Sequence, residues 1–394
     1  MKLNRIPLLI LVLALGTGCG DTRGGSSSSS SAGNNVLSIT VNGPGLNNSF
    51  PNEPCVSVTI CAPGTTNCQT INDILLDTGD SGLRIFKQAL SVPLVQVTTS
   101  GSGSLAECVR FADGWADWGP VQLADVILGG EPAVRVPIQV IDSTFGDPSV
   151  CGTQLEASPS DAGFNGILGV GLSAQDCGPG CANLANNTYY YTCTGASCAG
   201  TKAALTDQVQ NPVALLPQDN NGVIVKLPSV PSGGSPSVNG SLVLGIGTQS
   251  NNVPSGVTAF PANHNGYFTT TFNGTSYPKS FVDSGSNGLF FAPPASSPIP
   301  NCPTLSDWFC PSSTLPLRAT NTGAPGSPSG EVSFQISNLE RLRLNPSNNV
   351  FPDIGGSFPS GLFVWGLPFF FGRNVYVGFE GKTSSLGTGP YWAY

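Results

Sequence analysis

The chain of 394 residues contains a single histidine, His264. Metal sites with two or three histidine ligands are therefore excluded, and a triad or a Cys–His pair could be built only on this residue. General acid–base chemistry must otherwise fall to carboxyl groups. The sequence PANHNG around His264 is typical of a polar turn, so we expect a solvated loop histidine.

Charged residues are also scarce: they make up 10% of the chain, and the net charge is −8. An acidic chain with few cations cannot neutralise phosphates, which argues against a nucleic-acid partner. Hydrophobic residues make up 39%, enough for a large core, and the length suggests about two domains. The 50 glycines and 34 prolines favour an all-β protein over a helical one.

An apolar run at residues 6–15 is too short to span a bilayer. It follows Lys2 and Arg5 and precedes small residues, which is typical of a signal peptide over residues 1–18. We therefore expect an exported protein.

The sequence LGTGC that ends at Cys19 resembles a bacterial lipobox, in which this cysteine is lipidated. Ordinary signal cleavage nearby is the alternative. Residues 19–35 are rich in Ser and Gly, which predicts a flexible tether behind a lipid anchor. The expected location is the cell envelope, on its periplasmic or outer face, with membrane contact through the anchor only.

Twelve cysteines in an exported chain imply disulfides. Without Cys19 an odd number remains, so at least one is unpaired. Cysteines that are close in the sequence would form disulfides within local loops, as in Cys61–Cys68, Cys193–Cys198 and Cys302–Cys310. Spacing alone does not fix the connectivity. The spacings do not repeat as CxxC knuckles, which argues against zinc. We expect no metal and no cofactor.

Two segments of the chain resemble one another. The first is ILLDTGDSGL at residues 74–83, and the second is SFVDSGSNGL at residues 280–289. Both deliver an Asp into a Gly-bounded turn. Each is followed by an apolar pair that runs into a glycine, Gly169 after the first and Gly366 after the second. The ordered recurrence indicates duplication of one unit.

The chemistry of such a pair follows from its charges. Two carboxyl groups brought together by a pseudo-twofold axis cannot both ionise freely, so their titrations separate. The ionised Asp can take a proton from a water held between them, and the protonated Asp can give one to a carbonyl oxygen. Gly79 and Gly285 would let the backbones approach closely.

These motifs resemble the pepsin-like aspartic proteases, over most of the chain from about residue 37, and also a family of bacterial lipoproteins of unassigned function. The supporting segments resemble family strands in order: residues 164–172, 240–245, 266–268 and 365–379. The resemblance implies an all-β, bilobed fold with two pseudo-twofold-related lobes around a cleft and few short helices. The lobes would span residues 36–230 and 238–394.

Carried over to this chain, the family pattern makes Asp77 and Asp283 the catalytic dyad. Thr78 and Ser284 become hydroxyls that tie the two loops together through the opposite backbone. Gly79 and Gly285 complete the two motifs.

The family's flap hairpin would correspond to residues 110–118. Asp113 and Gly114 form a tight-turn signal at its tip, and Phe111 falls near the family's flap tyrosine. Trp115 and Trp118 could clamp a substrate or cap the core.

Two departures from the family pattern bear on activity. Asp80 stands where the family has a serine, and a third carboxylate there favours protonation of the site. Arg84 could pair with Asp80 and relieve the repulsion. Phe111 cannot supply a phenol hydrogen bond.

The resulting hypothesis is an aspartic endopeptidase, acting as a monomer on peptide or protein substrates. The alternative is a catalytically inactive surface protein that binds peptide or glycan in the same cleft. Two local expectations complete the analysis. Residues 201–210 are the best helix candidate, and residues 369–371 are expected to form a buried strand.

Overall fold

The computed structural model describes residues 33–43 and 50–394, and within these it is predominantly β with a few short helices. The prediction of an all-β fold is confirmed at this level. The predicted signal peptide, Cys19 and the tether up to residue 32 lie outside the described residues. Across the described ranges, no helix is both long and apolar enough to cross a membrane.

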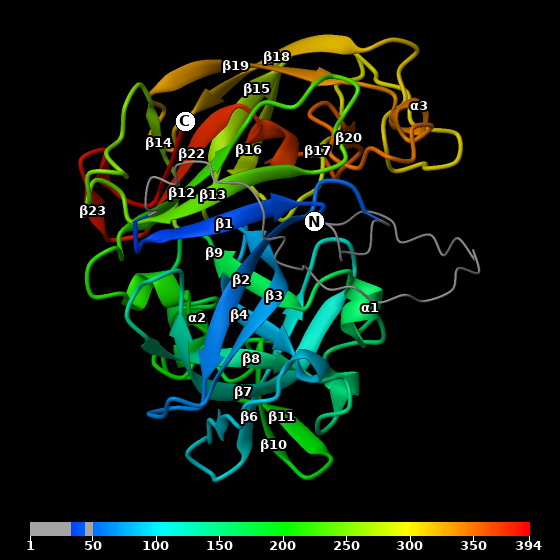
Figure 1. Ribbon diagram of the computed structural model, residues 1–394. Helices are drawn as coiled ribbons and strands as arrows, with labels where there is room; N and C mark the ends of the chain where they lie inside the picture. Colours follow the sequence, from blue (N-terminus) through cyan, green and yellow to red (C-terminus); the bar gives the residue numbers. More distant parts are fainter. Residues whose placement is uncertain (1–32, 44–49) are drawn as a thin grey trace.

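The larger sheet joins strands from the beginning, middle and end of the chain (Figure 1). Its 16 strands are β1 (Val36–Val41), β2 (Pro54–Cys61), β3 (Cys68–Asp77), β4 (Ser81–Phe86), β5 (Val95–Gln96), β6 (Ser104–Arg110), β7 (Ala116–Ile127), β8 (Val134–Ile141), β9 (Gly166–Val170), β10 (Tyr190–Thr194), β11 (Ser197–Gly200), β12 (Gly222–Leu227), β13 (Val238–Leu244), β14 (Ala259–Pro261), β22 (Arg373–Gly378) and β25 (Tyr391–Ala393).

The second sheet comes from the C-terminal half alone. Its seven strands are β15 (Phe268–Phe272), β16 (Thr275–Val282), β17 (Leu289–Phe291), β18 (Leu315–Thr322), β19 (Ser329–Ile336), β20 (Gly355–Gly356) and β21 (Leu362–Trp365). A small hairpin and short helical segments complete the described chain: β23 (Thr383–Ser384), β24 (Gly387–Thr388), α1 (Pro159–Ala162), α2 (Pro179–Asn183), α3 (Leu339–Leu342), η1 (Lys87–Ala89), η2 (Pro148–Val150), η3 (Pro212–Leu215) and η4 (Leu367–Phe369).

The repeat in the sequence is also a repeat in strand pairing. In the first copy β3 lies parallel to β9, and β4 lies antiparallel to the same strand. In the second copy β16 lies parallel to β21, and β17 lies antiparallel to it. Each Asp motif therefore leaves the end of a strand that is flanked by its own downstream glycine strand.

β1, β12 and β13 cross the middle of the molecule (Figure 1). β13 pairs with β1 along six residues, and on its other side it pairs with β12. β12 in turn pairs with β22, close to the C-terminus. The connection at residues 231–236 joins β12 to β13, two strands that pair directly.

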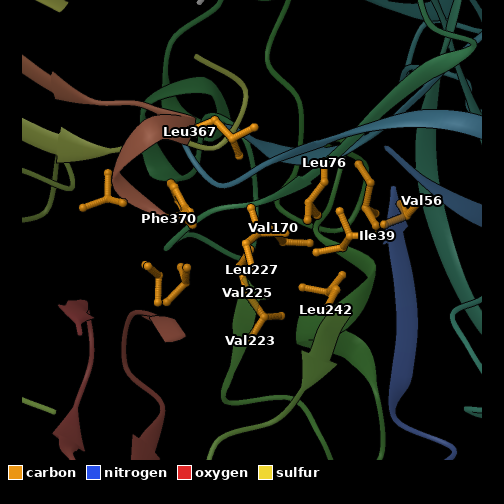
Figure 2. Close-up of a cluster of buried hydrophobic side chains, with 14 of the residues drawn as sticks. Ile39, Val56, Leu76, Val170, Val223, Val225, Leu227, Leu242, Leu367 and Phe370 are labelled. Carbon is orange, nitrogen blue, oxygen red and sulfur yellow. The ribbon is translucent and has the colours of Figure 1, made fainter. Parts of the chain in front are cut away.

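A single apolar cluster runs beneath both motifs (Figure 2). Leu76 precedes Asp77, Val170 ends β9, and Leu367 follows the second landmark glycine. All three are nearly or fully buried and share this cluster with Ile39 and Val225 of the central strands. Because side chains from distant segments fill one core, the two motifs cannot move apart without opening it.

The expected helix at residues 201–210 is wrong. The segment makes a single turn, in which Asp207 and Gln208 donate to the carbonyl of Ala204. The Gln208 amide donates to the carbonyls of Gly178 and Ala203. These side-chain bonds fasten the segment to a neighbouring loop and replace the repeating helical bonds. Residues 369–371 are buried as expected, but they form no strand: Phe369 ends η4, Phe370 lies in a turn and Phe371 makes an isolated bridge with Leu227.

Five disulfides form within the described chain. The three expected local pairs are confirmed, Cys61–Cys68, Cys193–Cys198 and Cys302–Cys310. The other two are Cys108–Cys151 and Cys177–Cys181. Cys55, buried in β2, belongs to none of these five.

Replacing Leu76 with Ala should lower the free energy of unfolding by about 2–5 kcal/mol, because it leaves a cavity in the shared core. Leu344 is 81% exposed and is the matched control. Leu344→Ala should change stability by no more than about 0.5 kcal/mol. Urea unfolding of both variants makes the comparison, and equal effects would contradict the placement of Leu76.

Candidate active site

Asp77 ends β3, and its side chain lies inside the turn that follows. The carboxyl oxygen Oδ1 accepts hydrogen bonds from the backbone N–H of Gly79 at 2.7 Å and of Asp80 at 3.0 Å. The residue is 7% exposed. The turn thus fixes the carboxyl group with donors from its own backbone, which needs only the spacing D-T-G-x.

Asp283 occupies the equivalent place after β16. Its Oδ1 accepts from the N–H of Gly285 at 2.9 Å, and its Oδ2 accepts from the Ser286 hydroxyl at 2.6 Å. Ser286 holds the position in the second motif that Asp80 holds in the first. Ser286 is not among the predicted site residues, although the shared D-[TS]-G-x frame is the signal that marks it.

The two loops hold one another through Thr78 and Ser284. The Ser284 hydroxyl accepts from the N–H of Thr78 at 3.1 Å and donates to the carbonyl of Leu76 at 2.7 Å. The Thr78 hydroxyl accepts from the N–H of Ser284 at 2.9 Å and donates to the carbonyl of Val282 at 3.2 Å. All four bonds are buried, and each hydroxyl bonds the backbone of the opposite motif.

Each carboxyl group lies against the glycine of the other motif. A Cβ atom placed on Gly79 would lie 2.7 Å from Cγ of Asp283, and one on Gly285 would overlap the carboxyl group of Asp77. The side chains of Asp77 and Asp283 therefore meet between the two glycines. No residue with a Cβ atom fits at either position without displacing a carboxyl group.

The two carboxyl groups differ in their readiness to ionise. Burial, followed by the charges of Asp283 and Asp80, raises the pKa of Asp77 well above its usual range. Burial also opposes ionisation of Asp283, but hydrogen bonds from Ser286, Asp77 and Gly285 favour its charged form. We therefore assign the shared proton to Asp77 and the negative charge to Asp283, as properties of a coupled pair.

The downstream glycines pack against these turns. A Cβ atom on Gly169 would lie 2.8 Å from the carbonyl carbon of Ser81, and one on Gly366 would lie 2.6 Å from the carbonyl oxygen of Ser286. Only a residue without a side chain lets the landmark strand pass this close. The landmark glycines of the sequence therefore serve as backing for the Asp loops.

The expected pairing of Asp80 with Arg84 is present. The guanidinium Nη1 lies 2.8 Å from Oδ2 of Asp80, whose side chain is 23% exposed. Burial raises the pKa of Asp80, and the charge of Arg84 acts against this shift. Arg84 itself is fully buried and reaches two more carboxyl groups, Glu107 and Asp176, which the sequence analysis missed. Their positions in the sequence carry no signal of this contact.

The hairpin expected at residues 110–118 forms between β6 and β7. Phe111 donates its N–H to the carbonyl of Trp115 at 2.8 Å, and Asp113 accepts from the N–H of Trp115 at 3.0 Å. Gly114 has a φ of 92°, which a glycine adopts without strain. The tight turn therefore falls at Asp113 and Gly114.

The aromatic residues of this hairpin face different surroundings. Phe111 packs against the apolar cluster that contains Leu75, two residues before Asp77, together with Phe86 and Phe164. Trp118 is fully buried and donates its indole N–H to the carbonyl of Phe145, so it belongs to the core. Trp115 is half-buried.

A cavity of about 750 Å³ adjoins the Asp77 loop. Polar and aromatic residues from both halves line it, including Asp80, Asp176, Tyr189 and Tyr267. His264 lies at its edge, where its exposed ring contacts Glu380 at 2.7 Å, in agreement with the expected solvated loop histidine. The space beside the dyad is therefore polar and large enough for a peptide side chain.

Residues 31–394 match the family described as a protein of unknown function, DUF3443. The chain belongs to this family. None of the curated proteins compared with the chain matches it. The family carries no description of an activity, so the function of this DUF3443 member has to be argued from its site.

Among the described residues, one group of side chains could in principle hold a metal ion, and it consists of Cys302, Cys310 and Glu340. The two cysteines form a disulfide, and Glu340 accepts hydrogen bonds from Thr304. These side chains already have partners and offer no ligand set to a metal.

Thr78 provides a direct test of the bracing between the two loops. Thr78→Val keeps the shape of the side chain but removes both hydroxyl bonds and leaves the N–H of Ser284 without an acceptor. The free energy of unfolding of Thr78→Val should be about 1–3 kcal/mol lower than that of Thr78→Ser, which keeps the hydroxyl. Urea unfolding measures the difference, and equal stability of the two variants would show that the hydroxyl contributes nothing.

Proposed function

We propose that this DUF3443 member is an aspartic endopeptidase with a bilobed, pepsin-like arrangement, in which Asp77 and Asp283 activate a water molecule. The observation that carries the proposal is the pair of buried carboxyl groups that face one another across hydroxyl-braced loops. Opposite pKa shifts accompany this geometry, and they distribute the roles of acid and base. A pair built only for stability would gain nothing from facing two like charges.

The reaction starts with Asp77 protonated and Asp283 ionised. Asp283 takes a proton from the bound water as the water oxygen bonds to the carbonyl carbon of the peptide. Asp77 gives its proton to the carbonyl oxygen, which yields a neutral tetrahedral diol. In the second step Asp283 returns its proton to the amide nitrogen as the C–N bond breaks. Asp77 recovers a proton from the diol, so the dyad is regenerated.

Substrate would lie between the β6–β7 hairpin and the polar cavity. Phe111, half-buried against the cluster that contains Leu75, offers an apolar surface on the hairpin side. The cavity beside Asp80 offers polar contacts on the other side. We therefore expect an extended peptide with an apolar side chain on one side of the scissile bond and a polar one on the other.

A second candidate function is binding without catalysis, in which peptide or glycan occupies the same space. Two residues favour it. Phe111 lacks the hydroxyl of a flap tyrosine, and Asp80 adds charge beside the dyad. The two candidates differ in turnover alone, so a cleavage assay separates them.

The proposed setting is the bacterial cell envelope, with the enzyme anchored through Cys19 and carried on its Ser/Gly tether. The signal-like N-terminus and the lipobox-like sequence support it, together with the five disulfides, which require an oxidising compartment.

The disulfide-bonded protein should cleave a mixed peptide library between about pH 3 and about pH 8, with a maximum on the acid side. Cleavage should fall at low pH as Asp283 gains a proton, and at higher pH as Asp77 loses its proton. Asp77→Asn combined with Asp283→Asn should reduce kcat/KM by about 10²-fold or more. The exposed residue Asp161 provides the control variant, Asp161→Asn, which should retain activity. A folded protein that cleaves nothing would favour the binding function.

The anchor predicts a change of location when Cys19 is replaced. In a bacterial host that processes lipoproteins, the wild-type protein should be found in the membrane fraction, and Cys19→Ser should move it to the soluble envelope fraction. If both proteins fractionate alike, ordinary signal cleavage is the better account of the N-terminus.

A further inference from the structure

Arg84 is a fully buried cation that lies between the Asp77 loop and the β6–β7 hairpin. Its Nη1 contacts Asp80 at 2.8 Å and the carbonyl of Ser81 at 3.1 Å. Its Nη2 contacts Glu107 of β6 at 3.1 Å and Asp176 at 3.4 Å. One guanidinium therefore fastens the dyad loop to a strand of the hairpin and to the loop before α2.

The carboxyl groups around Arg84 outnumber its charge. Asp80, Glu107 and Asp176 all contact the guanidinium, and the last two share the same nitrogen. If all three were ionised, a buried cluster would carry two uncompensated negative charges, which is costly in a medium of low polarity. A proton on one of them removes half of this excess.

The hydrogen bonds indicate which carboxyl group holds that proton. Asp176 accepts on Oδ1 from the hydroxyl of Tyr190 at 2.7 Å and on Oδ2 from Arg84, so both of its oxygens act as acceptors. Asp80 likewise accepts on both oxygens, from the N–H of Ser81 and from Arg84. Oε2 of Glu107 is buried and has no hydrogen-bond partner within the described residues. Of the three carboxyl groups, Glu107 is therefore the one that can carry a proton without giving up a donor.

The chemistry of the surroundings agrees with a proton on Glu107. Burial, followed by the charge of Asp176, raises the pKa of Glu107 well above its usual range, and Arg84 opposes this shift. The titratable groups that face the cluster come from every element packed against it: Arg84 of β4, Asp80 of the dyad loop, Asp176, Asp117 of β7, and Tyr189 and Tyr190 at β10. Arg84 is the one cation in this set.

The cluster connects to the dyad through Asp80. The N–H of Asp80 donates to Oδ1 of Asp77 at 3.0 Å, while its carboxylate is held by Arg84. A shift of Arg84 toward a doubly charged Glu107–Asp176 pair would pull on Asp80 and disturb the donor that orients Asp77.

We propose that Glu107 is a positioning residue for the dyad and that it works as a neutral carboxylic acid. As a neutral acid, Glu107 lets a single Arg84 serve three carboxyl groups and hold Asp80 in place against Asp77. The kinetic part of this inference rests on the proposed peptidase function. The protonation of Glu107 does not.

The sign of the pH dependence follows from the raised pKa of Glu107. The stability that its proton contributes is fully present below the pKa of an unfolded glutamate, about 4.3, and is lost as the pH rises through the higher pKa of the folded protein. Glu107→Gln mimics the protonated acid and should remove this loss. Glu331→Gln is the matched control, since Glu331 lies on the surface with a side chain 55% exposed.

Two measurements test the proton without any assay of activity. Infrared difference spectra of wild type and Glu107→Gln above pH 5 should show one protonated carboxyl carbonyl band that the variant lacks. The Tm of wild type should fall relative to that of Glu107→Gln as the pH rises, while Glu331→Gln should follow wild type. If no such band is lost, or if Glu107→Gln is the less stable protein at every pH, Glu107 is an ionised partner of Arg84 and the proposal is wrong.

The kinetic test separates positioning from mere stability. Glu107→Ala removes the contact with Arg84 and should lower kcat/KM by about 10-fold or more at all pH values. Glu107→Gln keeps a neutral partner for Arg84 and should restore most of that loss. If Glu107→Gln loses as much activity as Glu107→Ala, the positioning role is wrong. If the wild-type protein cleaves no peptide, the peptidase function fails, while the spectra still decide where the proton lies.

Discussion

Two buried carboxyl groups that face one another repel unless they share a proton, and the reciprocal hydrogen bonds of Thr78 and Ser284 fix the loops that bring them together. Each hydroxyl satisfies backbone groups in the opposite motif, so neither loop has a complete set of partners alone. The glycines next to these hydroxyls then set how closely the carboxyl groups approach. The strands, the shared core and the landmark glycines can all be understood as supports for this one contact.

The supports come from the whole length of the chain. β1, β12, β13 and β22 belong to one sheet, although they come from the start, the middle and the end of the sequence. The apolar side chains beneath the two Asp loops pack into one cluster with these strands (Figure 2). A closely packed core transmits displacement and does not absorb it. The distance between the two carboxyl groups is therefore fixed by the packing of segments that are remote from both.

Local patterns of the sequence predicted the parts of the site that depend on neighbours in the chain. The D-[TS]-G-x-x-G-L frame predicted the two Asp turns, and Asp113 and Gly114 predicted the hairpin turn. Cysteines that lie close in the sequence predicted three disulfides. Each of these features is decided by dihedral preferences and short loops, which sequence records directly.

Contacts between distant segments could not be predicted in this way. Glu107 and Asp176 meet Arg84 only because the fold brings β6 and the loop before α2 to the side chain of this β4 residue. The side chain of Gln208 overrides the helical propensity of residues 201–210 for the same reason, since its partners belong to another loop. The role of Trp118 was open between substrate contact and core, and burial by Tyr191 and Phe145 decides it.

Asp80 shows why a charged residue has to be judged in its surroundings. Taken alone, a carboxylate where the second motif has Ser286 would add a full negative charge beside a pair of carboxyl groups that already holds one. The carboxylate of Asp80 lies 2.8 Å from the buried guanidinium of Arg84. These two opposite charges act on Asp77 largely as a dipole, whose effect falls off faster with distance than that of a single charge. The backbone N–H of Asp80 still supplies the hydrogen bond that any residue at this position would give to Asp77. The substitution therefore keeps the donor that the turn needs and brings its own counter-charge, and Glu107 and Asp176 hold that counter-charge in place.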